Sequence, residues 1–336
     1  MSKLAKMNSG REINRVLLKD AIPLPVPFSV QVSVSDICNF ACKYCKNSIE
    51  SKRVKGTKGL LSWEKFQIIV DQFKQLCQQK QKKLKVFQFS GVGENLMHPK
   101  IIDMILLVKN SGISERIELL TNGARLSNEM SKTLIDAGLT RILISLQGIS
   151  AEDYKENCDI DIDFEKFIDE IRFFHDYGSK ENKCSVYLKG IDTAFPNKEA
   201  EKKFYDIYSP VCDTINIENA YRLFCDVPMD NVSGNHRYGY DVINKKCCDT
   251  IFTCAYLELN GDLSACSATP RLFWGNVFET PITELWYGAE HKKIMKTHLQ
   301  GLRETYPQCK DCQSILYQNM PADNVDQYMD ELLKRI

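Results

Sequence analysis

Three cysteines, Cys38, Cys42 and Cys45, stand close together on one short stretch of the chain, separated by three residues and then by two. Four thiolates would complete the ligand set of a zinc ion, whereas three thiolates can hold three corners of an iron–sulfur cube and leave the fourth iron open. An open iron can bind a small molecule. The three clustered cysteines therefore predict a reactive iron–sulfur site. The alternative is a structural zinc site whose fourth ligand lies elsewhere in the chain.

A glycine-rich segment follows further along the chain and carries Gly91, Gly93 and Glu94. Glycine lets the backbone approach a ligand closely, and the Glu94 carboxylate is suited to accept hydrogen bonds from an ammonium group. Two later segments, Thr121-Asn122-Gly123 and Ser145-Leu146-Gln147-Gly148, each follow an apolar run. Alone, each of these segments would be an ordinary turn.

In this order, the motifs resemble those of the radical S-adenosylmethionine (SAM) enzymes. The resemblance implies a [4Fe–4S] cluster on Cys38, Cys42 and Cys45, with SAM at its open iron. It also implies a set of SAM contacts, in which Glu94 binds the amino group and Tyr44 the adenine: Tyr44, Gly91, Gly93, Glu94, Asn122, Ser145 and Gln147. The chain departs from the commoner pattern at Val92 and Asn95, where the family usually has glycine and proline.

The elements that must position these motifs are short apolar runs that alternate with helix-like segments. Such alternation predicts a parallel sheet with an α/β fold, here a partial (β/α)6 barrel similar to a TIM barrel. Loops after the strands converge on one rim of such a barrel, and every motif above lies on such a loop. The expected strands are Val30–Val34, Val86–Phe89, Ile117–Leu120, Arg141–Leu146, Val186–Leu188 and Thr214–Ile217.

Four later cysteines could converge on a second metal centre: Cys248, Cys266, Cys309 and Cys312. From the residues alone, structural zinc and a fully ligated four-iron cluster are both compatible with this set. The sequence around Gly261, Cys266, Trp274 and Trp286 resembles the SPASM/twitch extension of radical SAM enzymes. That resemblance implies a small C-terminal iron–sulfur domain with one auxiliary [4Fe–4S] cluster.

Cys247, Cys248 and Cys254 are the candidates for the first of these ligands, and the preference for Cys248 depends on a hairpin. Asn260-Gly261 is a strong signal for a two-residue turn, and such a turn would place Cys266 opposite Ala255. Because neighbouring residues of a strand face opposite sides of the sheet, Cys254 would then point away from Cys266. Cys77, Cys158, Cys184 and Cys212 are expected to be buried thiols without a chemical role.

Domain boundaries follow from these assignments. We expect a lead-in at residues 1–27, a radical SAM core at 28–228, a linker at 229–245, the auxiliary domain at 246–313 and a C-terminal helix at 314–336. Only 37 residues precede Cys38. That length leaves no room for the leader-binding domain commonly found in peptide-modifying members, so a small polar substrate is expected.

Charged and amide side chains at the ends of the fifth and sixth strands are candidates for substrate binding: Lys189, Asp192, Glu218 and Asn219. The alternative is that Lys189 and Glu218 only neutralise each other, because a buried charge is costly unless it is paired. Cys225 follows the sixth strand and is a candidate hydrogen donor, although a plain core thiol is the simpler interpretation.

The expected function is reductive cleavage of SAM to a 5′-deoxyadenosyl radical, which abstracts hydrogen from a sugar or aminocyclitol. The enzyme would be an oxidoreductase or an epimerase, with dehydrogenation, epimerisation and dehydration left open. A maturase of a ribosomally made peptide and a zinc-stabilised interaction protein are the alternatives. A one-electron reductase such as flavodoxin or ferredoxin is the expected partner.

Composition bears on the remaining partners. Forty-four basic residues balance forty-four acidic ones, so no overall field attracts nucleic acid or a membrane surface. The chain shows no apolar run long enough for a bilayer and no secretory signal pattern, and fourteen cysteines fit a reducing compartment. We therefore expect a cytoplasmic protein.

Overall fold

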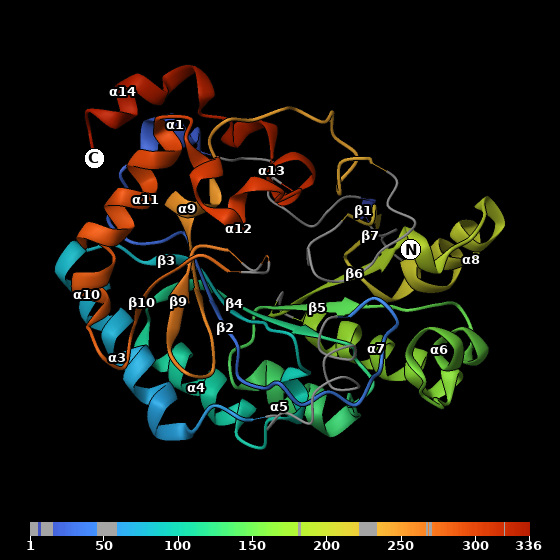
Figure 1. Cartoon of the computed structure of the whole chain (residues 1–336). Helices are drawn as coiled ribbons and strands as arrows, with labels where there is room; N and C mark the ends of the chain where they lie inside the picture. Colours follow the sequence, from blue (N-terminus) through green and yellow to red (C-terminus); the bar gives the residue numbers. More distant parts are fainter. Residues whose placement is uncertain are drawn as a thin grey trace.

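The computed structural model describes residues 6–7, 16–45, 59–180, 183–221, 234–266, 268, 271–318 and 320–336. Figure 1 shows strands and helices alternating along the chain as far as β7. The strands are β1 (Lys6–Met7), β2 (Ser29–Val32), β3 (Leu84–Phe89), β4 (Ser114–Thr121), β5 (Arg141–Ser145), β6 (Ser185–Ile191), β7 (Thr214–Glu218), β8 (Cys254–Leu257), β9 (Asp262–Ser264) and β10 (Phe273–Asn276). The α-helices are α1 (Leu18–Ala21), α3 (Trp63–Lys80), α4 (Ile101–Ser111), α5 (Asn128–Asp136), α6 (Ala151–Cys158), α7 (Phe164–Ser179), α8 (Lys198–Tyr208), α9 (Thr250–Thr253), α10 (Ile282–Leu285), α11 (Ala289–Leu299), α12 (Pro307–Lys310), α13 (Ser314–Tyr317) and α14 (Met329–Leu333).

One sheet contains all the strands of the described residues, in the order β1-β7-β6-β5-β4-β3-β2-β8-β9-β10. Strands β2 to β7 are parallel to their neighbours. All six expected strands are present, within a few residues of their expected bounds. The sheet ends at β1 and β10 without closing, so the expected α/β fold on a partial barrel is confirmed.

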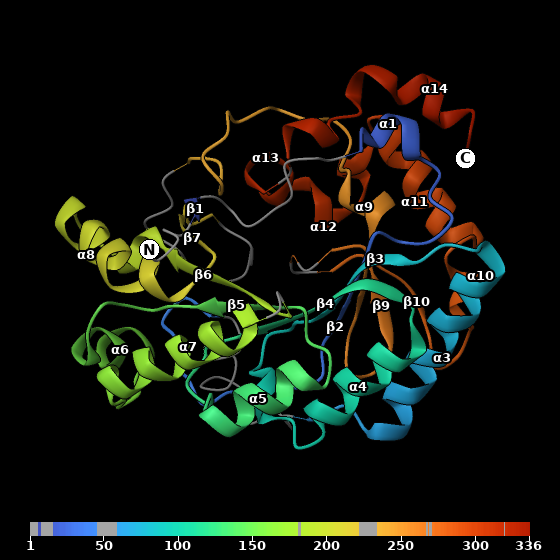
Figure 2. The same ribbon diagram turned by 180° about the vertical axis from the view of Figure 1, so that it is seen from behind.

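Helices cover the outer face of the sheet. Helix α3 begins after Ser62, whose hydroxyl accepts a hydrogen bond from the Lys65 amide, as expected of an N-cap. Its apolar face, including Phe66 and Phe73, is fully buried in the core. Figure 2 shows α3, α4, α5 and α7 in succession along this face. These helices do not cover the rim where the loops after the strands lie. That rim carries the site motifs.

The C-terminal part of the chain continues the barrel sheet. Strand β8 pairs in parallel with β2, with Ser29 opposite Cys254, so a backbone ladder joins the barrel to the C-terminal part of the chain. The Trp286 indole N–H also donates to the Leu24 carbonyl at 3.1 Å. The cysteines of the C-terminal part are thus held at a fixed place beside the first strand of the barrel.

The β8–β9 hairpin has a different register from the expected one. Tyr256 pairs with Ser264 and Leu257 with Leu263, and the Gly261 amide donates to the Glu258 carbonyl. Gly261 has φ of +90°, which is typical of the last residue of a three-residue hairpin loop. The loop is therefore one residue longer than the expected two-residue turn. Continuing this register places Cys266 opposite Cys254, so the expectation that Cys254 faces away from Cys266 was wrong.

The expected C-terminal helix is also interrupted. Residues 314–336 form α13, two short 3-10 turns at Pro321–Asp323 and Asp326–Tyr328, and α14. The Asn324 side chain accepts a hydrogen bond from the Asp326 amide, a turn that competes with a continuous helix. Within the described part of the chain, no helix combines the length and apolar character needed to cross a bilayer.

Candidate active site

The three-cysteine loop follows β2 and is fastened on two sides. The Glu94 amide donates to the Ile37 carbonyl at 2.8 Å, which joins the loop to the glycine-rich segment after β3. The Ala41 amide donates to the Cys158 carbonyl at 2.8 Å, which joins the loop to the end of α6. The loop is therefore positioned by backbone contacts of the protein itself.

The cysteines of this loop lie near one another. Burial raises the pKa of Cys38 to about 11, and the neighbouring Glu94, Cys42 and Cys45 act in the same direction. Cys42 and the fully buried Cys158 are 3.3 Å apart between their sulfurs. The described residues contain no group of three or more His, Cys, Asp or Glu side chains arranged around a single metal ion. Three thiols on one loop fit the donor set of a four-iron cluster with one open iron.

The two glycines of the second motif serve the packing of the protein. A Cβ at Gly93 would lie 2.2 Å from the Ser35 carbonyl oxygen, and a Cβ at Gly91, which has φ of +155°, would lie 2.5 Å from the Ser33 hydroxyl. Both contacts are with β2 or the chain just after it. These glycines bring the second motif against the cysteine loop, and direct contact with SAM stays a prediction.

Glu94 is the buried centre of this junction. Its carboxylate accepts hydrogen bonds from the Thr121 hydroxyl at 2.7 Å, the Asn122 amide at 2.7 Å and the Leu96 amide at 2.9 Å. Burial raises its pKa, and these three hydrogen bonds oppose that effect. A carboxylate has about four acceptor positions, so one is left for a further donor such as an ammonium group.

Two further predicted SAM contacts are Asn122, which follows β4, and Tyr44, which lies in the three-cysteine loop. The Asn122 side-chain amide donates to the Asn39 side chain at 2.8 Å and lies 3.9 Å from the Cys38 sulfur. The Tyr44 hydroxyl is buried and has no partner among the described residues, while part of the residue remains accessible. Asn122 thus contacts the cysteine loop through Asn39, and the Tyr44 hydroxyl can still form a hydrogen bond with a ligand.

Ser145 and Gln147 follow the same rim. Ser145 ends β5 and pairs in register with Lys189 of β6. The Gln147 side chain donates to the Ser145 carbonyl at 3.2 Å, and its own oxygen is buried without a partner in the described chain. Buried polar atoms normally have partners, and the oxygens of Tyr44 and Gln147 have none among the described residues, so both can still form a hydrogen bond with a polar ligand. The residues present therefore fit SAM beside an iron–sulfur cluster.

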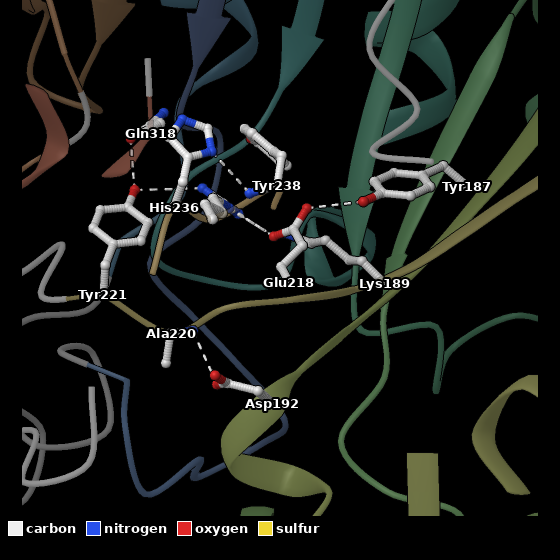
Figure 3. A network of polar contacts seen from close by, with 10 residues as sticks. Tyr187, Lys189, Asp192, Glu218, Ala220, Tyr221, His236, Tyr238 and Gln318 are labelled. Carbon is white, nitrogen blue, oxygen red and sulfur yellow. Dashed lines mark hydrogen bonds and ion pairs between the residues drawn. The ribbon is translucent and has the colours of Figure 1, made fainter. Parts of the chain in front are cut away.

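A buried ionic network occupies the rim at β6 and β7 (Figure 3). Glu218 accepts a hydrogen bond from the Tyr187 hydroxyl at 2.9 Å and pairs with the Arg237 guanidinium at 2.5 Å, while the Lys189 ammonium lies 4.0 Å away. Burial acts to raise the pKa of Glu218, but the charges of Arg237 and Lys189 outweigh it and hold the pKa below its ordinary value.

Sequence reasoning missed Arg237, because it lies in the segment expected to be a linker. Its amide donates to the Tyr317 carbonyl at 2.7 Å, and its guanidinium lies 5.6 Å from the centre of the Tyr221 ring. The Tyr221 hydroxyl in turn donates to the Gln318 side chain at 2.6 Å. The run His236-Arg237-Tyr238 is unusually rich in aromatic and charged residues for a linker, and this was the available signal.

The other expected substrate contacts are partly engaged in backbone hydrogen bonds. Asp192 accepts from the Ala220 amide at 2.9 Å, as Figure 3 shows, and the Asn219 side chain donates to the His236 carbonyl at 2.8 Å. Both residues lie at the barrel rim together with Lys189 and Glu218. Cys225 lies outside the described residues.

A cavity lies beside β8 and is lined by all four cysteines of the expected auxiliary site. It is lined by Cys248, Cys254, Cys266, Cys309 and Cys312, together with His298 and Gln318. Burial raises the pKa of Cys266, with Cys248, Cys312 and Cys309 acting in the same direction. Four thiols at one cavity match the donor set of one fully ligated cluster. The Cys254 sulfur instead accepts a hydrogen bond from the Gln31 side chain at 3.5 Å.

Comparison with family models decides the classification. A model described as the radical SAM superfamily matches residues 32–193, and the SPASM model, described as an iron–sulfur cluster-binding domain, matches residues 247–313. The chain belongs to the radical SAM superfamily. Its C-terminal part is a SPASM iron–sulfur domain, so both resemblances inferred from the sequence are confirmed.

Curated relatives of this radical SAM protein match it over part of their length. GTP 3′,8-cyclase of Limosilactobacillus fermentum is 32% identical over 127 residues, which cover 38% of this chain and 36% of that protein. The tungsten-containing aldehyde ferredoxin oxidoreductase cofactor-modifying protein of Pyrococcus furiosus is 29% identical over 116 residues, covering 34% and 29%. The chain therefore spans about a third of the length of these relatives.

Solved structures resemble the radical SAM protein over more of its length. BtrN in complex with AdoMet and 2-DOIA has a TM-score of 0.57 at 16% identity and covers 90% of this chain and 98% of its own. Streptococcus suis SuiB bound to precursor peptide SuiA has a TM-score of 0.58 at 14% identity, covering 81% and 67%. Native anSMEcpe with bound AdoMet has a TM-score of 0.58 at 15% identity, covering 91% and 96%. These likenesses show the shared fold.

Proposed function

We propose that this protein is a radical SAM enzyme that abstracts hydrogen from a small polar substrate, a sugar or an aminocyclitol. When bound at Cys38, Cys42 and Cys45, a [4Fe–4S] cluster would supply one electron to SAM and release a 5′-deoxyadenosyl radical. The protein's own part is to hold SAM and substrate in register and to exclude water.

The placement of Glu94 carries this proposal. Its amide binds the cysteine loop. Burial raises the pKa of the Cys38 thiol, and the negative charge of the Glu94 carboxylate acts in the same direction. Three hydrogen bonds fix the carboxylate, and one acceptor position remains for the SAM ammonium. A ligand bound by Glu94 therefore has its amino group beside the three cysteines, as chelation at the open iron requires.

The ionic network at β6 and β7 supports a polar substrate. Glu218, Arg237 and Lys189 place charges at a rim that also carries Ser145, so a substrate bound there is next to the SAM site. Hydroxyl and amino groups can form hydrogen bonds with the polar atoms of this network, whereas an apolar substrate would remove water from those atoms without replacing its hydrogen bonds. The likeness to BtrN, whose structure holds AdoMet and 2-DOIA, supports the same class.

Dehydrogenation is the reaction that uses both cysteine sites. The substrate would lose a hydrogen atom to the 5′-deoxyadenosyl radical, a second electron to one auxiliary [4Fe–4S] cluster, and a proton to the rim or to solvent. Cys248, Cys266, Cys309 and Cys312 would hold that cluster. The alternatives are epimerisation, with a thiol such as Cys225 as hydrogen donor, and dehydration. Analysis of the products distinguishes both from dehydrogenation.

The test is anaerobic incubation with SAM, dithionite and deuterated polyols or aminocyclitols. Deuterium in the released 5′-deoxyadenosine, in the unsubstituted chain but not in Cys38→Ala, would support the proposal, and flavodoxin or ferredoxin would replace dithionite as electron donor. The likeness to SuiB bound to SuiA makes peptide modification the second candidate. Deuterium transfer from labelled peptides, without transfer from polyols or aminocyclitols, would favour peptide modification. Zinc in place of iron in the purified protein would favour a zinc-stabilised interaction protein.

A further inference from the structure

His298 is a buried side chain to which the proposed function gives no role. It lies near the end of α11, is 1% exposed and lines the same cavity as the four cysteines of the auxiliary site. Neither of its ring nitrogens has a hydrogen-bond partner among the described residues. Buried polar atoms normally have hydrogen-bond partners, so a partner from the cavity is expected.

The other histidine of α11 shows what a structural role looks like. Both ring nitrogens of His291 bind backbone carbonyls, those of Trp286 and Ile251, each at 2.9 Å. His291 is thus fully used by the fold. His298, two helical turns further along, is equally buried but has no such bonds.

The surroundings of His298 keep it uncharged. Burial and the nearby positive charge of Arg303 lower its pKa to about 4. The Arg303 guanidinium donates a hydrogen bond to the carbonyl of Cys309, one of the four cysteines of the auxiliary site. A neutral imidazole carries one N–H donor and one acceptor, so His298 keeps a single donor at the cavity wall.

We propose that the His298 N–H donates a hydrogen bond to a sulfur of the auxiliary cluster and thereby sets its reduction potential. This inference rests on the auxiliary cluster of the proposed function. Hydrogen bonds to cluster sulfurs stabilise the more negative, reduced state and raise the potential. His298 is a positioning residue in this sense, since it would favour transfer of the substrate electron without touching the substrate.

The experiment uses the full chain in a Cys38→Ala, Cys42→Ala, Cys45→Ala background, so that only auxiliary iron remains. The midpoint potential of that iron is measured by redox titration followed by electron paramagnetic resonance. His298→Phe should shift the potential downward, because it removes the donor and keeps a ring in the cavity wall. His298→Gln keeps an N–H donor and should restore most of the shift. His175→Phe, at a partly exposed site on α7, should leave the potential unchanged.

Each outcome decides the inference. An unchanged potential in His298→Phe, or an equal shift in His298→Gln, would overturn it. Loss of iron in His298→Phe with retention in His298→Gln would support it, whereas loss in both would overturn it. Absence of iron from the background chain also overturns it, while the proposed SAM cleavage is judged separately by 5′-deoxyadenosine release from the chain with all its cysteines.

Discussion

At the scale of single residues, Glu218 shows how a barrel rim holds a buried carboxylate. The sequence suggested Lys189 as its partner, but that ammonium lies 4.0 Å away and Arg237 makes the close contact. A guanidinium offers a planar fork of donors that matches a carboxylate better than an ammonium does. The rim therefore depends on a residue from the segment expected to be a linker.

Replacing Arg237 should destabilise the fold through this pair. Arg237→Met leaves the buried Glu218 charge without its main partner, which costs about 3–5 kcal/mol in comparable buried pairs. Denaturant unfolding would measure the loss. Arg172→Met, which removes one partner of an exposed pair with Asp169, should cost less than about 1 kcal/mol. Equal losses in the two variants would contradict the assignment.

The same pair makes a prediction for pH. The folded pKa of Glu218 lies below its ordinary value of 4.5, so its ionised form stabilises the native state above about that pH. This contribution is lost as the pH falls through the folded pKa. The difference in unfolding free energy between the unsubstituted chain and Arg237→Met should therefore shrink on acidification below pH 4.5. A difference that stays constant with pH would refute this account.

Gly93 tests the junction between the two motifs. Gly93→Ala would place a methyl group 2.2 Å from the Ser35 carbonyl oxygen, and backbone must move to accept it. We expect loss of the iron bound by the cysteine loop and retention of the auxiliary iron, measured by iron and sulfide analysis. Gly59→Ala is the control, because its methyl group would meet only Leu259, at 3.8 Å. Full iron in Gly93→Ala would show that the junction is not needed.

At the scale of elements, the sequence predicted the features that depend on residues close together in the chain. The apolar runs Val86–Phe89 and Arg141–Leu146 depend on neighbours in the sequence, and strands were found where both were expected. The β8–β9 register depends on one positive φ at Gly261, which two loop lengths allow. The Arg237 contact depends on chain segments that only the fold brings together, so no local pattern could predict it.

The corrected hairpin changes the reason for choosing the auxiliary ligands. Cys254 and Cys266 now fall on the same side of the hairpin, and both line the cavity. Cys248 is still preferred, because it is among the thiols that raise the pKa of Cys266, whereas Cys254 binds the Gln31 side chain. Cys248→Ala should lose the auxiliary iron and Cys254→Ala should keep it. Equal retention in the two variants would reject this ligand set.

At the scale of the whole molecule, one sheet joins the two cysteine sites. Strand β2 leads into the cysteine loop on one side of the ladder, and its partner β8 forms a wall of the auxiliary cavity. The network from Glu218 through Arg237 and Tyr221 to Gln318 makes a second connection, which ends at the same cavity. Side-chain contacts therefore connect the β7 end of the barrel rim to the auxiliary cavity.

The most direct test of the central claim is 5′-deoxyadenosine release from SAM by the anaerobically reconstituted protein. The claim is that the loop of Cys38, Cys42 and Cys45 holds an iron–sulfur cluster with one open iron beside Glu94. With dithionite, the unsubstituted chain should release 5′-deoxyadenosine and methionine, and Cys45→Ala should release neither while keeping its auxiliary iron. An iron-loaded chain that leaves SAM intact, or a Cys45→Ala variant that cleaves it equally fast, would contradict the account.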